Sequence, residues 1–94
     1  MKQVITFKSN PDYYEKEKLG LKCNTVRVFE LCDDREYLLR DIMSEEIKKE
    51  DVVLKIENNE TGETFERMIS DLTFFATNGV EIYVISWIHK DEVV

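Results

Sequence analysis

The sequence predicts a single α+β domain in which a mixed, mostly antiparallel sheet forms the main layer or curls into a small barrel. Five segments of the 94 residues have the alternating, β-branched or aromatic composition of strands, and turn signals dominate the second half. The two segments with helical spacing both lie in the first half, unlike the strand-helix alternation of a parallel, doubly wound sheet. At this length one core is expected, so residues 1–94 form one domain.

The first elements are a strand and a capped helix. Residues 2–8 alternate as a strand does. Asn10 can cap the helix that follows, because its side-chain oxygen accepts from free amides, and Pro11 suits the first helical position. We expect the helix to run from Pro11 to about Leu19 and to end at Gly20, which readily adopts the left-handed conformation.

A second strand and a second helix come next. Residues 24–31 alternate, and we expect both faces of this strand to be partly covered. The two faces are Val26, Val28 and Glu30 against Arg27, Phe29 and Leu31. After Asp33 or Asp34 as a cap, apolar residues recur at helical intervals over about 35–43.

The second half of the chain predicts three strands. Residues 51–58 and 64–75 alternate, and the polar segment Asn58-Asn59-Glu60-Thr61-Gly62 between them is the strongest hairpin signal in the chain. Asn78-Gly79 predicts another tight turn, before the nearly continuous apolar run 81–88.

Such a run belongs in the middle of a sheet. We therefore expect Trp87, and Phe7 of the first strand, to be largely buried. Residues 89–94 are expected to fray.

Composition and charge limit the classes of function. The chain is 43% hydrophobic and 35% charged, so disorder is not expected. Its net charge of −7 argues against bulk non-specific binding to nucleic acid, which is driven by phosphate neutralisation. The first 27 residues nevertheless hold six basic and three acidic residues, a net charge of +3 that leaves −10 on the other 67. This first quarter could bind a small anion.

Neither a membrane segment nor a metal site is predicted. No apolar run approaches the roughly 20 residues that cross a bilayer, and the N-terminus lacks a signal peptide's apolar block, so we expect a cytoplasmic protein with no membrane partner. Cys23 and Cys32 lack the paired spacing and His partners of a zinc site and are interpreted as small apolar side chains. His89 is expected at the surface. We predict no metal and no cofactor.

The segment from Gly20 to Arg27 gathers the side chains best suited to chemistry, since the common catalytic and phosphate-loop motifs are missing. Thr25 and Arg27 point to one face of an extended segment, and the flexible Lys22 can reach that face from the preceding turn. Together they could hold a phosphate, a carboxylate or a polarised carbonyl. The alternative is ordinary scatter of surface charge. Truncating Lys22 or Thr25 is expected to cost about 1 kcal/mol or less.

The pattern Gly20-x-Lys22-x-x-Thr25-x-Arg27, after Ile5-Thr6-Phe7 and a short helix, resembles the opening of ASCH domains of the PUA-like superfamily, in particular the small bacterial acetylcytidine amidohydrolases. Residues 47–53 are similar to that family's entry into the next strand, with Glu50 where Gly is usual, and Tyr83-Val84-Ile85 resembles its closing strand. The resemblance touches most of the chain in order, and its specific part is residues 20–27.

The resemblance implies a five- to six-stranded barrel with one or two short helices and a cleft for RNA or a modified nucleoside. In the amidohydrolases the residue matching Lys22 is the base, the one matching Thr25 is the nucleophile, and a Glu from a later insertion completes the site. This chain has no such insertion between residues 67 and 80, so Glu66 and Glu81 are candidates for that Glu only by their position in the sequence.

Three functions follow from these observations. The first is a module that binds a nucleotide, nucleoside or short RNA through Lys22, Thr25 and Arg27. The second is an amidohydrolase that deacylates an acetylcytidine-like nucleoside. The third is an interaction protein, for example of phage or mobile-element origin, whose acidic surface meets a basic partner. The acidic residues of that surface are Asp33, Asp34, Asp41, Glu45 and Glu46.

Overall fold

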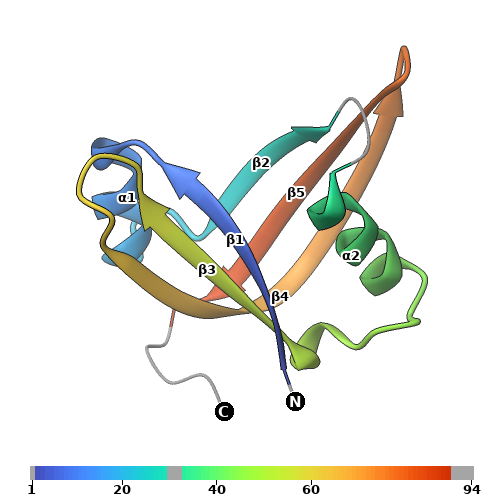
Figure 1. The fold of residues 1–94 in the computed structure, drawn as a ribbon, viewed down its shortest axis with the longest axis horizontal. Coiled ribbons are helices and arrows are strands. Elements are labelled where there is room, and N and C mark those ends of the chain that lie inside the picture. Colours follow the sequence, from blue (N-terminus) through green and yellow to red (C-terminus); the bar gives the residue numbers. More distant parts are fainter. Residues whose placement is uncertain (1, 30–32, 90–94) are drawn as a thin grey trace.

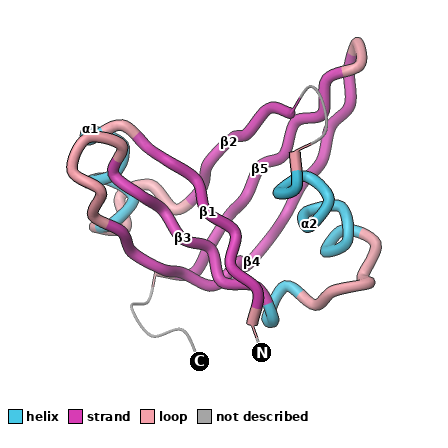
Figure 2. Tube along the Cα trace, viewed as in Figure 1, coloured by secondary structure: helices cyan, strands magenta, loops and turns pink. Residues whose placement is uncertain are grey.

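A five-stranded mixed sheet, mostly antiparallel, curls into half a barrel and is covered by two short helices (Figures 1 and 2). The computed structural model describes residues 2–29 and 33–89. The strands are β1 (Gln3–Ser9), β2 (Asn24–Phe29), β3 (Val52–Asn58), β4 (Thr64–Thr77) and β5 (Val80–Ile88), and the helices are α1 (Pro11–Lys18), α2 (Asp34–Met43) and a 3-10 turn at Lys49–Asp51. The predicted α+β fold class is confirmed.

The strand order is β1-β3-β4-β5-β2. β1 and β3 pair in parallel, whereas each of the other neighbouring pairs is antiparallel, including the predicted hairpin of β3 and β4. The apolar strand β5 lies inside the sheet, between β4 and β2, as its sequence predicts. β1 and β2 are therefore the two edges of the sheet.

The long strand β4 bends the sheet. Its residues 64–68 pair with β3 and its residues 68–77 with β5. The pairing with β5 shifts register between Ile69 and Asp71, so that Ser70 is skipped. A bulge of this kind bends a strand and increases its twist. At the far end of β4, Asn78 and Gly79 have φ of +49° and +78°, which suits the tight turn that their sequence predicts.

The core fills the concave side of the curled sheet. Phe7 and Trp87 are 1% and 4% exposed, which confirms their predicted burial. α1 closes one end of the half-barrel, where Tyr14 packs on Phe65 with ring centroids 5.2 Å apart. α2 closes the other end and adds Leu39 to the core.

Both helices begin at caps that the sequence predicts. The Asn10 Oδ1 atom accepts a hydrogen bond of 2.9 Å from the Tyr13 amide, and the Asp33 Oδ1 atom accepts one of 2.9 Å from the Arg35 amide. The Arg35 guanidinium also pairs with the Asp33 carboxylate at 2.7 Å, which lowers the pKa of Asp33 below its usual value. α1 ends at Lys18, with Leu19 as its C-cap directly before Gly20, and the Leu21 amide donates back to the Lys16 carbonyl.

A buried carboxylate joins α2 to the sheet. Glu36 accepts a hydrogen bond of 2.8 Å from the Tyr83 hydroxyl, and its other oxygen pairs with Arg40 at 2.6 Å. Burial raises the pKa of the Tyr83 phenol, and the neighbouring Glu36 carboxylate raises it further. Hydrogen-bond donors to both carboxylate oxygens stabilise the charge of Glu36, which would otherwise be costly to bury.

The expectation that both faces of β2 are partly covered is wrong. Its Val26 and Val28 side chains are 58% and 57% exposed, whereas the opposite face carries the buried Thr25 and Phe29. β2 is an edge strand, and none of the helices within residues 2–29 and 33–89 packs on its convex side (Figure 2). The rest of the predicted strand, Glu30 and Leu31, lies outside the described residues.

Two further sequence predictions concern the cysteines and the C-terminal end. Cys23 is a free, half-buried thiol packed against the core, as expected for a small apolar side chain, and Cys32 lies outside the described residues. His89 is exposed as expected, while the predicted frayed tail beyond it is not described. No helix within residues 2–29 and 33–89 is long and apolar enough to cross a membrane.

Gly20 is constrained by its backbone conformation and by the neighbouring His89 ring. Gly62 has the same backbone conformation without a close neighbour, so it is a matched control. Both have positive φ, +82° and +79°, but a Cβ on Gly20 would lie 2.8 Å from the His89 ring, whereas a Cβ on Gly62 would meet nothing within 4 Å. We predict that Gly62→Ala costs about 1–2 kcal/mol, the penalty of left-handed backbone, and that Gly20→Ala costs more. Chemical denaturation measures both. In a His89→Ala background, Gly20→Ala should cost no more than Gly62→Ala does. If the two glycine substitutions cost the same in the native background, the close contact with His89 is contradicted.

Candidate functional site

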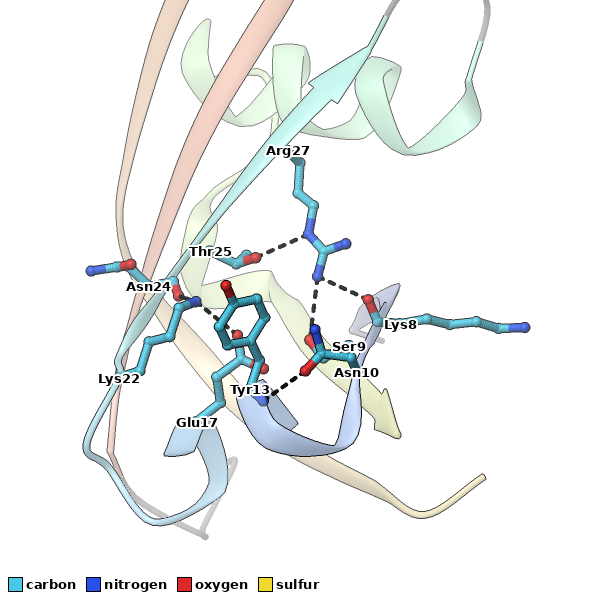
Figure 3. Close-up of polar contacts among 9 residues, drawn as sticks. All are labelled: Lys8, Ser9, Asn10, Tyr13, Glu17, Lys22, Asn24, Thr25 and Arg27. Carbon is cyan, nitrogen blue, oxygen red and sulfur yellow. Dashed lines mark hydrogen bonds and ion pairs between the residues drawn. The ribbon is translucent and has the colours of Figure 1, made fainter. Parts of the chain in front are cut away.

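A pocket of about 440 Å³ lies between the end of β1, helix α1 and the start of β2 (Figure 3). Lys22, Thr25 and Arg27, the three site residues predicted from the sequence, all line it. The rest of its lining is Lys8, Ser9, Asn10, Tyr13, Glu17, Asn24, Val26 and Asn59. The fold therefore brings the predicted residues together with side chains from three other segments.

Arg27 and Thr25 face inward from the same side of β2, as their spacing predicts. The Arg27 Nε donates a hydrogen bond of 3.0 Å to the Thr25 hydroxyl. Thr25 is buried, so its hydroxyl lies at the floor of the pocket and not at its rim. In this arrangement the Thr25 oxygen acts as an acceptor for Arg27.

Arg27 also joins the two edges of the sheet. Its Nη2 donates to the Lys8 carbonyl at 3.0 Å and lies 3.4 Å from the Ser9 hydroxyl, both on β1 (Figure 3). Its guanidinium carbon lies 4.9 Å from the centroid of the Phe7 ring. Burial lowers the pKa of Arg27, the nearby Glu17 carboxylate opposes that shift and the Arg35 guanidinium adds to it, yet a guanidinium stays protonated in proteins. The remaining nitrogen, Nη1, makes no hydrogen bond within the described residues and can donate to a ligand.

Lys22 is held by a buried carboxylate that sequence reasoning missed. Its Nζ atom forms an ion pair of 3.0 Å with the Oε2 atom of Glu17, and it also donates to the Asn24 carbonyl. The Glu17 side chain is 1% exposed. Removing Lys22 would leave a buried charge without its partner, which costs about 3–5 kcal/mol where it has been measured. The structure therefore revises the expectation that Lys22 can be truncated at little cost.

Glu17 sits in the sequence Glu15-Lys16-Glu17-Lys18, which is typical of a solvated helix face. The available signal is its spacing: Glu17 is three residues after the buried Tyr14 and four after Tyr13, so it shares the inner side of α1. The alternating charges instead predict an exposed helix face, because lysine and glutamate are rarely buried without a partner.

The two carboxylates suggested by sequence position do not reach this pocket. Glu66 is exposed on β4, opposite Lys55 of β3. Glu81 lies opposite Phe29 at the other end of β2, where its carboxylate is 3.6 Å from Arg40. The carboxylate that accompanies Lys22 and Thr25 is Glu17.

The rim of the pocket supplies an aromatic face and amide groups. Tyr13 is 51% exposed, and the Lys22 Nζ lies 5.5 Å from the centroid of its ring. Asn10 and Asn59 also line the pocket, and side-chain amides can both donate and accept, whereas the Asn24 side chain points away from it (Figure 3). With Lys22 and Arg27 against Glu17, the pocket carries more positive than negative charge, while the Lys8 side chain points away from it (Figure 3).

Among residues 2–29 and 33–89, no three His, Cys, Asp or Glu side chains lie together as metal ligands would. A larger pocket, of about 690 Å³, lies between the end of α2 and β4 and contains none of the predicted site residues. Its charged lining residues make no ion pair within the part of the chain that the structure describes; they are Glu45, Lys48, Lys49, Glu50 and Asp71. The smaller pocket is the one with an organised set of polar contacts.

No protein-family model matches this sequence, and no curated protein matches it. We therefore infer the chemistry of the site from its own residues.

The role of Arg27 in joining β1 to β2 can be measured. We predict that Arg27→Ala lowers the free energy of unfolding by roughly 1.5–3 kcal/mol, because the variant loses charged hydrogen bonds to both strands. Lys8→Ala is the control: its carbonyl remains to accept from Arg27, and its exposed side chain makes only a 3.8 Å ion pair with Glu57, so it should change stability by less than about 0.5 kcal/mol. If denaturation gave equal losses for the two variants, Arg27 would not join the edges.

Proposed function

We propose that this chain is a small ASCH-like module that binds a nucleotide, free or within a short single-stranded RNA, in the pocket of Lys22, Thr25 and Arg27. The observation that carries the proposal is the meeting of those three residues, predicted from one sequence block, with an exposed tyrosine in a single pocket. A volume of about 440 Å³ lies within the roughly 300–1,000 Å³ of small-ligand sites.

The cations of the pocket suit a phosphate. Within the described residues Arg27 keeps Nη1 for a ligand after its other nitrogens have bonded to β1 and Thr25, and the Lys22 ammonium lines the same pocket. Charge-assisted hydrogen bonds from guanidinium and ammonium groups to phosphate oxygens are among the stronger ones in proteins. One phosphate matches this small set of donors better than the backbone of a long duplex does, because the rest of the chain is strongly acidic.

The aromatic and amide groups suit a base. Single-stranded bases stack on exposed aromatic rings, and Tyr13 offers such a ring beside the cations. The amide of Asn59, which also lines the pocket, can pair with the edge of a base. We propose that the protein does this in the cytoplasm.

The acidic-surface function has less support from the described contacts. Of its residues, Asp33 caps α2 and pairs with Arg35, so that carboxylate is already occupied within the fold. A basic partner remains the outcome to consider if nucleotides fail to bind.

Tyr13→Ala tests the stacking role with little risk to the fold, since the side chain is half-exposed. We predict binding of a nucleoside 5′-monophosphate to weaken by about 1–3 kcal/mol in Tyr13→Ala and to persist in Tyr13→Phe, measured by titration calorimetry. Tyr37→Ala, which removes an exposed tyrosine of α2, is the matched control.

Mononucleotides and a short oligonucleotide should be titrated separately, to distinguish a free nucleotide from RNA. The salt dependence should correspond to about one to three phosphate contacts; a steep slope, or equal effects of the two alanine variants, would contradict this site.

The second candidate is an amidohydrolase, favoured by the presence of an amine, a hydroxyl and a carboxylate in one pocket: Lys22, Thr25 and Glu17. Against it, Lys22 donates to two oxygens and Thr25 accepts from Arg27, so neither is arranged as base and nucleophile.

Thr25→Val separates the two candidates. In a binding module it should cost about one neutral hydrogen bond, roughly 0.5–1.5 kcal/mol of affinity. In an amidohydrolase it should abolish turnover and leave affinity almost intact. Incubation with N4-acetylcytidine, followed by chromatography, measures turnover; we predict none in the native protein, and release of cytidine that stops in Thr25→Val would establish the enzyme.

A further inference from the structure

One oxygen of the buried Glu17 carboxylate has no hydrogen-bond partner within residues 2–29 and 33–89. The Oε2 atom pairs with Lys22 at 3.0 Å, but the Oε1 atom accepts nothing. A buried acceptor left unsatisfied is costly, and more so when it is charged. Because Glu17 lines the pocket, a ligand in that pocket can supply the missing donor.

The chemistry of that donor is restricted. An ionised carboxylate only accepts hydrogen bonds, so the group that meets Oε1 must carry N–H or O–H. A cationic donor is disfavoured, since Lys22 and Arg27 already place positive charge around Glu17. A neutral donor on an otherwise anionic ligand fits both features of the pocket.

The position of Glu17 favours a donor on the base. Tyr13 and Glu17 are four residues apart on α1, so both lie on the same side of the helix, and in Figure 3 the Tyr13 ring lies in front of the Glu17 carboxylate. A base stacked on Tyr13 therefore has its edge near Glu17. Asp and Glu carboxylates accept hydrogen bonds from the exocyclic amino group of a base such as cytosine.

We propose that Glu17 selects a nucleotide whose base carries an amino group, which donates a hydrogen bond to Oε1. The inference rests on the proposed nucleotide-binding function and adds the class of base to it. Because Oε1 is closed to solvent in this conformation, the entering base reaches it by displacing the half-exposed Tyr13 ring, which then stacks on the base.

The native protein provides the first test, with pairs of ligands that differ only in the amino group. Cytidine 5′-monophosphate is compared with the 5′-monophosphate of pyrimidin-2-one riboside, and adenosine 5′-monophosphate with that of purine riboside. Loss of a hydrogen bond to a charged group should weaken binding by about 10- to 100-fold in at least one pair. Equal affinity within both pairs overturns the inference and leaves nucleotide binding intact, whereas the absence of binding by all four overturns the proposed function together with it.

Glu17→Gln is the second test. Lys22 has only donors, so the amide oxygen of Gln should turn toward Lys22 and its NH₂ group should occupy the former position of Oε1. We expect the preference for the amino-bearing ligand to disappear or reverse. Glu15→Gln, the same charge change at an exposed position of α1, should keep the native preference. A folded Glu17→Gln with native preference overturns the inference; if that variant does not fold, the ligand pairs with the native protein decide.

Discussion

The two edge strands of the curled sheet are not hydrogen-bonded neighbours, and Arg27 is the side chain that joins them. It starts on β2, bonds the main chain of β1 and lies on the Phe7 ring, so it closes the half-barrel where a further strand pair would close a full one. The pocket exists because this closure is made by a side chain. A ladder of main-chain bonds would have sealed the gap, whereas a guanidinium leaves space and a donor beside it.

Helix α1 builds the other wall of the pocket from residues that also hold the helix in place. Tyr14 packs into the core, and the next turn brings Glu17 under the surface, where Lys22 must follow it because a buried carboxylate needs a cation. The left-handed Gly20 allows the chain to reverse within the few residues between them. Helix termination, charge neutralisation and the position of the binding groups are therefore one local arrangement.

Each end of the half-barrel contains a buried carboxylate, and the two carboxylates differ in the hydrogen bonds they receive. At the α2 end, Glu36 receives donors on both of its oxygens, from Tyr83 and Arg40, and is structurally satisfied. At the α1 end, Glu17 receives a donor on one oxygen only from the part of the chain that the structure describes, and it lines a pocket with an exposed aromatic ring. This contrast between two buried carboxylates of one small domain is the reason to assign ligand recognition to the α1 end.

The sequence by itself determined the helices and strands, because caps, turn residues and alternation act locally. Asn10 and Asp33 cap the two helices, and Asn78-Gly79 forms the tight turn, as the local sequence predicts. It also determined that Thr25 and Arg27 share a face, since the period of a strand is two. Only the tertiary structure decided which strands are edges, and hence that Val26 and Val28 are exposed. It also decided that Glu17, and not Glu66 or Glu81, accompanies Lys22, because burial of a charge depends on contacts between segments that local patterns do not encode.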